Sequence, residues 1–240
     1  MSRPRAARQA RPPGPGHRRH PAVPEDWAEI LDPAEWRLGP DGLPFRRAAR
    51  VLALTAQGQV LLMEGHDVAD PEHRWIFTPG GGLRPGEEAA AGAVRELAEE
   101  TGLRVEPGDL EGPIAQRDAV FRFARVVCRQ HESLFLLRLP ATTDLDAAGW
   151  TALEREAVDS MRWWGAADLE QARRQGREIY PVALPGLVAE LAAGGWDGRP
   201  RDLTDPVDAR DLAGLAGGHE ETAMRSRSVR DGAMTGGDEA

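Results

Sequence analysis

The chain has 240 residues, of which 41% are hydrophobic, and a formal net charge of −9 at pH 7. This length and composition predict one folded domain of medium size with tails, and the acidic balance argues against general binding of nucleic acid. The single cysteine, Cys128, excludes an internal disulfide, and no apolar run approaches the ~20 residues that cross a bilayer. We therefore expect a cytoplasmic protein that does not span a membrane.

The two ends of the chain differ in composition from its middle. Residues 1–24 are rich in arginine and proline and contain no acidic residue, which indicates a disordered arm. Residues 199–240 are expected to form a mostly disordered acidic tail with a transient helix at 209–215. The folded domain is therefore expected to comprise residues 25–198.

Between the tails, the hydrophobic pattern predicts alternating strands and helices. Two short apolar runs separated by Gln57 and Gly58 predict a hairpin of buried strands, and a polar loop is expected at 66–72. The predicted strands are 48–54, 59–63, 74–77, 114–119, 121–127, 133–139 and 161–164. The predicted helices are a short turn within 26–38 and the segments 87–101, 151–158, 167–175 and 184–193. This alternation predicts the α/β class, as an α/β/α sandwich with a mixed β-sheet.

The most informative stretch is a glycine-rich turn followed by a helix. Gly80, Gly81 and Gly82 are expected to take positive φ angles and to let the backbone approach a ligand closely. The helix is expected to begin near Glu87 and to end at Gly102, since glycine commonly follows a helix end. A P-loop is excluded, because glutamates follow the last glycine of this turn where Lys-Ser or Lys-Thr is required.

Three carboxylates are predicted to lie together on this helix. Glu96, Glu99 and Glu100 stand at positions i, i+3 and i+4, which are neighbours on one helical face. Mg²⁺ prefers oxygen ligands, so a tight carboxylate cluster suggests a site for such a cation, although an acidic run alone is more often a solvated surface. The apolar residues expected to pack inward on the opposite side are Ala90, Val94, Leu97 and Ala98.

A longer pattern surrounds these glutamates. Gly81, five residues, Glu87, seven residues, Arg95-Glu96-Leu97, one residue, Glu99-Glu100, one residue and Gly102-Leu103 fill every fixed position of the Nudix box. The motif is highly specific, and the chain resembles the Nudix hydrolases. The resemblance is close from about residue 46 to residue 139, looser to about residue 193, and does not cover the tails.

The resemblance implies the Nudix fold and a hydrolase that cleaves a phosphoanhydride bond with Mg²⁺ or Mn²⁺. The expected substrate is a small nucleotide, a nucleoside diphosphate linked to another group. Because an acidic cluster repels a diphosphate, divalent cations must lie between the two. The resemblance implies that Glu96, Glu99 and Glu100 are metal ligands, and that the general base is Glu96, another of these or a carboxylate outside the box.

Other residues have expected supporting roles. Arg95 is expected to orient a box carboxylate by a charge-assisted hydrogen bond, and Glu87 to fix the loop to the helix. Glu132 is a weaker candidate for a further ligand or base, and is otherwise an exposed residue of a strand. Arg74 is a weak candidate for a phosphate contact.

Two alternative functions remain open on the sequence alone. One is a nucleotide-binding or sensing module of the same fold that has no catalytic activity. The other is a pyrophosphohydrolase of RNA 5′ ends, helped by the arginine-rich arm. A homodimer is also open, and the identity of the substrate depends on loops that differ among relatives.

Overall fold

The structure is a computed structural model, and it describes residues 19–204. The strands are β1 (Arg37–Leu38), β2 (Pro44–Thr55), β3 (Val60–Asp67), β4 (Asp70–Phe77), β5 (Gly80–Gly82), β6 (Leu110–Phe123), β7 (Val126–Leu139), β8 (Val158–Trp164), β9 (Glu178–Tyr180) and β10 (Arg201–Asp202). The helices are α1 (Trp27–Ile30), α2 (Ala89–Thr101), the 3₁₀-helix η1 (Pro107–Asp109), α3 (Ala152–Ala157), α4 (Ala166–Arg174) and α5 (Leu184–Gly194). Within this range, no helix is long and apolar enough to cross a membrane.

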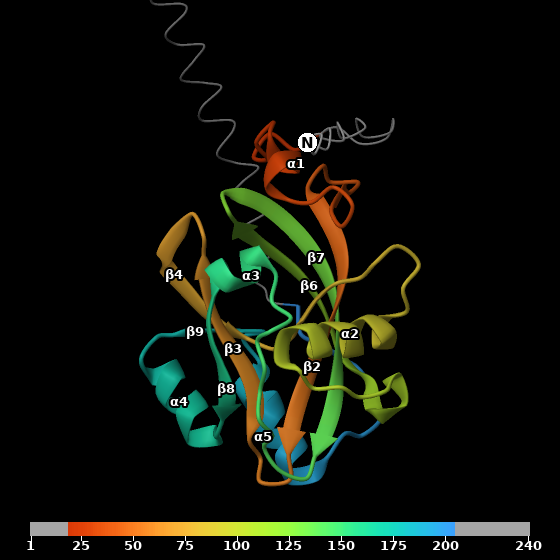
Figure 1. The fold of residues 1–240 in the computed structure, drawn as a ribbon, viewed down its shortest axis with the longest axis vertical. Coiled ribbons are helices and arrows are strands. Elements are labelled where there is room, and N and C mark those ends of the chain that lie inside the picture. Colours follow the sequence, from red (N-terminus) through yellow and green to blue (C-terminus); the bar gives the residue numbers. More distant parts are fainter. Residues whose placement is uncertain (1–18, 205–240) are drawn as a thin grey trace, which may run out of the picture.

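The strands belong to one mixed sheet with the order β10-β6-β7-β2-β3-β4-β9. β2 is parallel to β7 and antiparallel to β3, which it meets only at Leu54 and Val60, beside the turn that joins them. Beyond that point the two strands separate, and the short strand β5 pairs with β2 instead. Figure 1 shows the β3–β4 and β6–β7 pairs apart in the middle of the molecule, and the ends of the two hairpins meet again where the N–H of Ala124 donates to the Asp67 carboxylate at 3.2 Å.

Helices cover both faces of the sheet, because side chains of a strand point alternately to its two faces. The odd-numbered residues of β2 from Ala49 to Ala53 pack against Leu97 of α2. The even-numbered Leu52 and Leu54 belong to a separate cluster with Leu187 of α5. Figure 1 accordingly shows α2 in front of the sheet and α5 behind it. The predicted α/β/α sandwich with a mixed sheet is confirmed.

A third apolar cluster joins the N-terminal segment 19–43 to one end of the β6–β7 hairpin. Val23, Trp27 and Trp36 are buried there against residues of β7 that include Val127. The folded part of the chain therefore begins before residue 24, where the disordered arm was predicted to end.

The fold also continues past residue 198. β10 pairs in parallel with β6 within the segment predicted to be a tail. The helix predicted at 209–215 lies outside the described residues, as does most of the predicted N-terminal arm.

Several predicted strand boundaries are wrong, including those around the predicted loop at 66–72 and the predicted break near residue 120, and β7 begins at Val126 instead of residue 133. The loop predicted at 66–72 is mostly strand, because β3 and β4 stay paired almost to their connecting turn while the polar side chains of β4 are exposed. The break predicted near residue 120 is absent, since β6 is continuous to Phe123 and the chain turns at Ala124 and Arg125 instead. Both turn residues have positive φ angles, of 45° and 66°, a conformation for which glycine is the usual sequence signal.

Candidate active site

The box glycines form an edge strand rather than a turn. In β5, Gly80, Gly81 and Gly82 pair with Arg50, Ala49 and Ala48 of β2. Of the three glycines only Gly80 has a positive φ, of 135°, so the positive φ angles expected for Gly81 and Gly82 are wrong.

Helix α2 follows this strand and presents the box glutamates to it. The helix begins at Ala89, two residues later than expected, and ends at Gly102, which takes the left-handed conformation with φ of 77°. Its buried face includes Leu97 and also Glu100, whereas Val94 and Ala98 are only partly buried. The prediction that the apolar face lies opposite the glutamates is therefore only partly correct, because the packed face includes one of the carboxylates.

Arg95 connects the loop, the helix and three carboxylates. Its Nε and Nη2 donate to the two carboxylate oxygens of Glu87, both at 2.8 Å, and Nη2 also donates to the Gly82 carbonyl at 3.0 Å. Its Nη1 donates to Glu96 at 2.6 Å and to Glu99 at 3.1 Å. The hydrogen bonds from Arg95 hold the pKa of Glu87 below its ordinary value, so this ion pair stays charged at neutral pH.

Glu87 also joins the helix to the loop before it. Its Oε2 accepts a hydrogen bond of 2.8 Å from the backbone N–H of Arg84. Together with the ion pair to Arg95, this bond explains why the helix starts later than the sequence suggested: the Glu87 side chain closes the loop instead of lying on the helix.

Two carboxylates of α2 lie directly against the glycine strand. A Cβ on Gly81 would lie 2.7 Å from Oε2 of Glu96, so only glycine leaves room for this carboxylate. The backbone N–H of Gly80 donates to Oε2 of Glu100 at 2.6 Å. Burial raises the pKa of Glu96, and burial together with the nearby Glu96 carboxylate raises the pKa of Glu100 to about 8.

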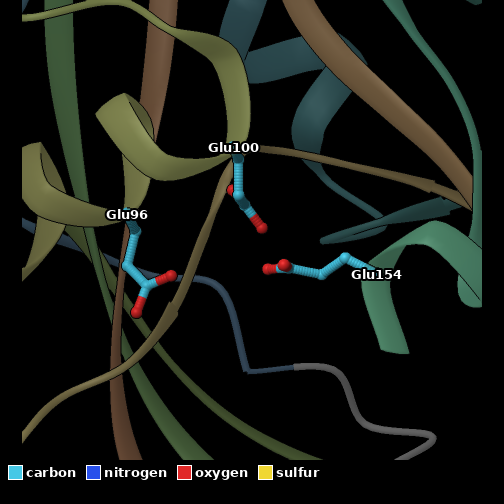
Figure 2. Close-up of side chains that lie close together, drawn as sticks. All are labelled: Glu96, Glu100 and Glu154. Atoms are coloured by element: carbon cyan, nitrogen blue, oxygen red, sulfur yellow. The ribbon is translucent and has the colours of Figure 1, made fainter. Parts of the chain in front are cut away.

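A third carboxylate comes from a helix far along the sequence. Oxygen atoms of Glu96, Glu100 and Glu154 all lie within 4.8 Å of one another. Figure 2 shows the side chains of Glu96 and Glu100 from α2 and Glu154 from α3 converging on a common point. Glu154 is also the last residue of a capping box, in which it accepts from the Thr151 N–H.

Glu154 reaches this place because the segment before α3 packs on the end of α2. The last carbonyl groups of a helix have no partners within it, and here Asp146 N–H donates to the Thr101 carbonyl at 2.9 Å. The indole Nε1 of Trp150 donates to the Glu100 carbonyl at 2.6 Å. The only sequence signal near Glu154 is the Thr-x-x-Glu spacing of the capping box, which predicts a helix start and not a site.

The structure places the remaining predicted site residues elsewhere. Glu99 is outside the three-carboxylate group, half-exposed and paired with Arg95 and Arg84. Glu132 is buried rather than exposed, in ion pairs with two arginines. Arg74 is on β4, where it is paired with Asp159 of β8.

The donor set of the three-carboxylate group fits a hard divalent cation. Its ligand atoms are all oxygens, as Mg²⁺ and Mn²⁺ prefer. Burial raises the pKa of both Glu96 and Glu100, so ionising the two carboxylates costs free energy that the nearby arginines do not offset. A cation between the three carboxylates would supply the missing positive charge.

Comparison with known proteins identifies the family. The family model described as NUDIX domain matches residues 44–183, which is more than half of the 240 residues. The chain therefore belongs to the Nudix family, the sandwich described above is the Nudix fold, and the protein is a hydrolase that acts on pyrophosphate bonds.

Among curated proteins, an RNA pyrophosphohydrolase of Roseobacter denitrificans is 29% identical over 163 residues, which cover 62% of this chain and 95% of that protein. The human diphosphoinositol polyphosphate phosphohydrolase 3-alpha is 38% identical over 77 residues, or 32% of this chain and 44% of that protein. The chain thus matches less than half the length of the second relative.

Solved structures are similar at lower identity. A MutT protein from Methanosarcina mazei is 19% identical, with a TM-score of 0.43 over 62% of this chain and 93% of that one. An Ap4A hydrolase from C. elegans is 16% identical, with a TM-score of 0.40 over 62% of this chain and 96% of that one.

Proposed function

We propose that this protein is a Mg²⁺- or Mn²⁺-dependent hydrolase that cleaves the phosphoanhydride bond of a nucleoside diphosphate derivative. Water attacks phosphorus, the bridging P–O bond breaks, and two phosphorylated products leave. The observation that carries the proposal is the convergence of Glu96, Glu100 and Glu154 beside the glycine strand.

The cation site in this proposal consists of Glu96, Glu100 and Glu154. Glu99, which directly precedes Glu100 on α2, joins them when the cation binds. The ion pairs of Glu99 with Arg84 and Arg95 are partly exposed, and pairs of this kind stabilise a protein by no more than about 1 kcal/mol. Replacing these ion pairs by a bond to the cation therefore costs little free energy. A divalent cation there would neutralise the charge of the phosphoanhydride and lower the pKa of a bound water.

Glu96 is the proposed general base. Its Oε1 is held by Nη1 of Arg95, which leaves Oε2, the atom beside Gly81, to accept the proton of the attacking water. Arg95 thus orients the base while Gly81 leaves room for its free oxygen.

The proposal is tested with purified protein and Mg²⁺ against a panel of nucleoside triphosphates, dinucleoside polyphosphates, nucleotide sugars and ADP-ribose. Glu154→Gln is compared with Glu156→Gln, since Glu156 is an exposed carboxylate on the same short helix. We expect Glu154→Gln to weaken Mn²⁺ binding and turnover at least 10-fold while Glu156→Gln changes neither. Ligand binding without turnover of any compound in the panel would reject hydrolysis of these substrates.

A second candidate substrate is the 5′-polyphosphate end of RNA. It is favoured by the match to a protein named RNA pyrophosphohydrolase over 95% of that protein's length. A 5′-triphosphorylated oligonucleotide therefore belongs in the panel. Release of pyrophosphate from this oligonucleotide, with binding that weakens steeply with salt and depends on residues 1–18, would favour RNA over free nucleotides as the substrate.

A further inference from the structure

A partly buried arginine lies beside the glycine strand β5, on its paired strand β2. Arg50 is in the middle of β2, directly opposite Gly80 in the pairing of β2 with β5. Its side chain is 15% exposed, while its neighbours two residues away on the same face, Ala48 and Leu52, are apolar. A charged residue is therefore present where an apolar one would satisfy the packing.

The guanidinium of Arg50 binds the backbone of residues 78–80, which lead into β5 and are called the glycine loop. Its Nη1 donates to the Thr78 carbonyl at 2.9 Å and to the Gly80 carbonyl at 3.1 Å. Its Nε donates to Oε1 of Glu132 at 2.7 Å. One planar group thus joins the loop to a buried carboxylate of β7.

Glu132 is itself held in place. The same Oε1 accepts from Nε2 of Gln130 at 2.6 Å, and Oε2 accepts from Nη1 of Arg117 at 3.4 Å. Burial acts to raise the pKa of Glu132, but Arg50 and Arg117 outweigh it and hold that pKa below its ordinary value. The carboxylate is charged at neutral pH, and it fixes the orientation of the Arg50 guanidinium.

Gly80 connects Arg50 to the cation site. While its carbonyl accepts from Arg50, its N–H donates to Glu100 at 2.6 Å. Only glycine allows this close approach to β2, because a Cβ at this position would lie 2.3 Å from the Ala49 carbonyl oxygen and 2.5 Å from Cα of Arg50. The N–H that binds Glu100 therefore lies between two carbonyl groups, those of Thr78 and Gly80, that both accept from Arg50.

The energy of such a network argues for a role beyond stability. Burying two charges costs several kcal/mol of hydration, and a buried ion pair is often no more stable than an apolar pair of the same volume. What an arginine provides, and an apolar side chain does not, is donors in fixed directions. Here two of those directions end on carbonyls of the glycine loop.

We propose that Arg50, oriented by Glu132, is a positioning residue that fixes the glycine loop so that Gly80 holds Glu100 in the geometry required for cation binding. This inference rests on the proposed cation site. It also gives Glu132 a role other than that of a ligand or base: Glu132 acts through Arg50.

The test compares Arg50→Gln and Arg50→Lys with Arg129→Gln. Arg129 is a matched control, because it is also a partly buried arginine in an ion pair, with Asp41, and it lies over the ring of Phe45. Mn²⁺ binding is measured directly by the signal of free Mn²⁺ in electron paramagnetic resonance, at a temperature where thermal unfolding shows every variant to be folded. A merely structural role would change the unfolding temperature and leave the Mn²⁺ dissociation constant unchanged.

We expect Arg50→Gln to raise the Mn²⁺ dissociation constant about 10- to 100-fold, the range typical of residues that orient metal ligands. Arg50→Lys should have a smaller effect in the same direction, since an ammonium group lacks the planar fork, and it carries the test if Arg50→Gln does not fold. Arg129→Gln should change the constant less than about 2-fold. If a folded Arg50 variant binds Mn²⁺ as tightly as the wild type, the inference about Arg50 is wrong but the proposed function stands. If the wild-type protein neither binds Mn²⁺ nor turns over any substrate, the proposed function is wrong as well.

Discussion

The indole Nε1 of Trp150 donates a hydrogen bond of 2.6 Å to the backbone carbonyl of Glu100. This bond joins the segment that carries Glu154 to the end of the helix that carries the other two carboxylates. Gly149 permits this close approach of the two segments, because a Cβ on it would lie 2.2 Å from the Glu99 carbonyl oxygen. The third carboxylate of the site is therefore positioned by the C-terminus of α2.

Trp150→Phe should weaken cation binding without removing any carboxylate. The substitution keeps an aromatic ring but leaves the Glu100 carbonyl without its donor, which should lower the free energy of unfolding by about 1 kcal/mol. We expect the Mg²⁺ concentration for half-maximal activity to rise several-fold as α3 loses its anchor. Trp163→Phe is the control, because it removes an indole hydrogen bond to the Thr143 carbonyl. An equal effect of both variants would contradict this account of how Glu154 is positioned.

Gly81→Ala should impair activity more than stability. The backbone of Gly81 does not require glycine, but the new methyl group would lie 2.7 Å from Oε2 of Glu96 and displace that flexible side chain. We expect turnover to slow at least 10-fold with an unfolding temperature close to that of the wild type. Gly108→Ala, with open space around the new methyl group, should change neither. A large drop in unfolding temperature for Gly81→Ala would show that strand β5, rather than the Glu96 side chain, moves to accommodate the methyl group.

The metal-free protein should lose stability as the pH rises from about 5 to 8. The pKa of Glu100 is raised to about 8 in the folded state, whereas an unfolded glutamate titrates near 4.3. Between these values the folded state holds a proton that the unfolded state releases, so the free energy of unfolding falls by at most about 1.4 kcal/mol per pH unit. Urea unfolding at several pH values in a chelator measures this slope.

Two controls accompany the pH series. Glu100→Gln should flatten the slope, and saturating Mg²⁺ should do the same in the wild-type protein, because a bound cation stabilises the carboxylate form. Glu156→Gln should leave the slope unchanged. A metal-free wild-type protein whose stability is constant over this pH range would show that Glu100 is ionised without a cation.

Arg95→Lys should reduce both stability and activity, although it keeps the charge. A lysine cannot reproduce the two-pronged contact with Glu87 while also reaching Gly82 and Glu96. We expect a loss of about 2 kcal/mol in the free energy of unfolding, the scale of a hydrogen bond to a charged group, and turnover that is slower by a factor of at least 10. Arg84→Lys, at an exposed ion pair with Glu99, should cost less than about 1 kcal/mol. Equal losses in the two variants would refute the connecting role of Arg95.

The sequence predicts the parts of the site that depend on local geometry. Glu96 and Glu100 are one turn apart on a helix whose end is marked by Gly102, and both features follow from residues close together in the chain. The mixed sheet between helices follows in the same way from the alternation of apolar runs.

The parts that depend on tertiary packing could not be predicted. Glu154 joins the site only because Trp150 and its neighbours bind the free carbonyls at the end of α2, a contact that no local pattern encodes. Glu99 satisfies the same spacing rule as its neighbours, yet arginines on both sides hold it away from them. Glu132 looked exposed because the arginines that pair with it lie on other strands.

The boundaries of the family match do not coincide with those of the folded unit. Trp36, which precedes residue 44, is buried against the end of the β6–β7 hairpin and lies under the guanidinium of Arg46. In a recombinant fragment trimmed to 44–183, Val126 and Val127 would be exposed to solvent. The fragment would also lack β10, the strand that pairs with β6. Such a fragment would aggregate, and its inactivity would say nothing about the chemistry of the intact enzyme.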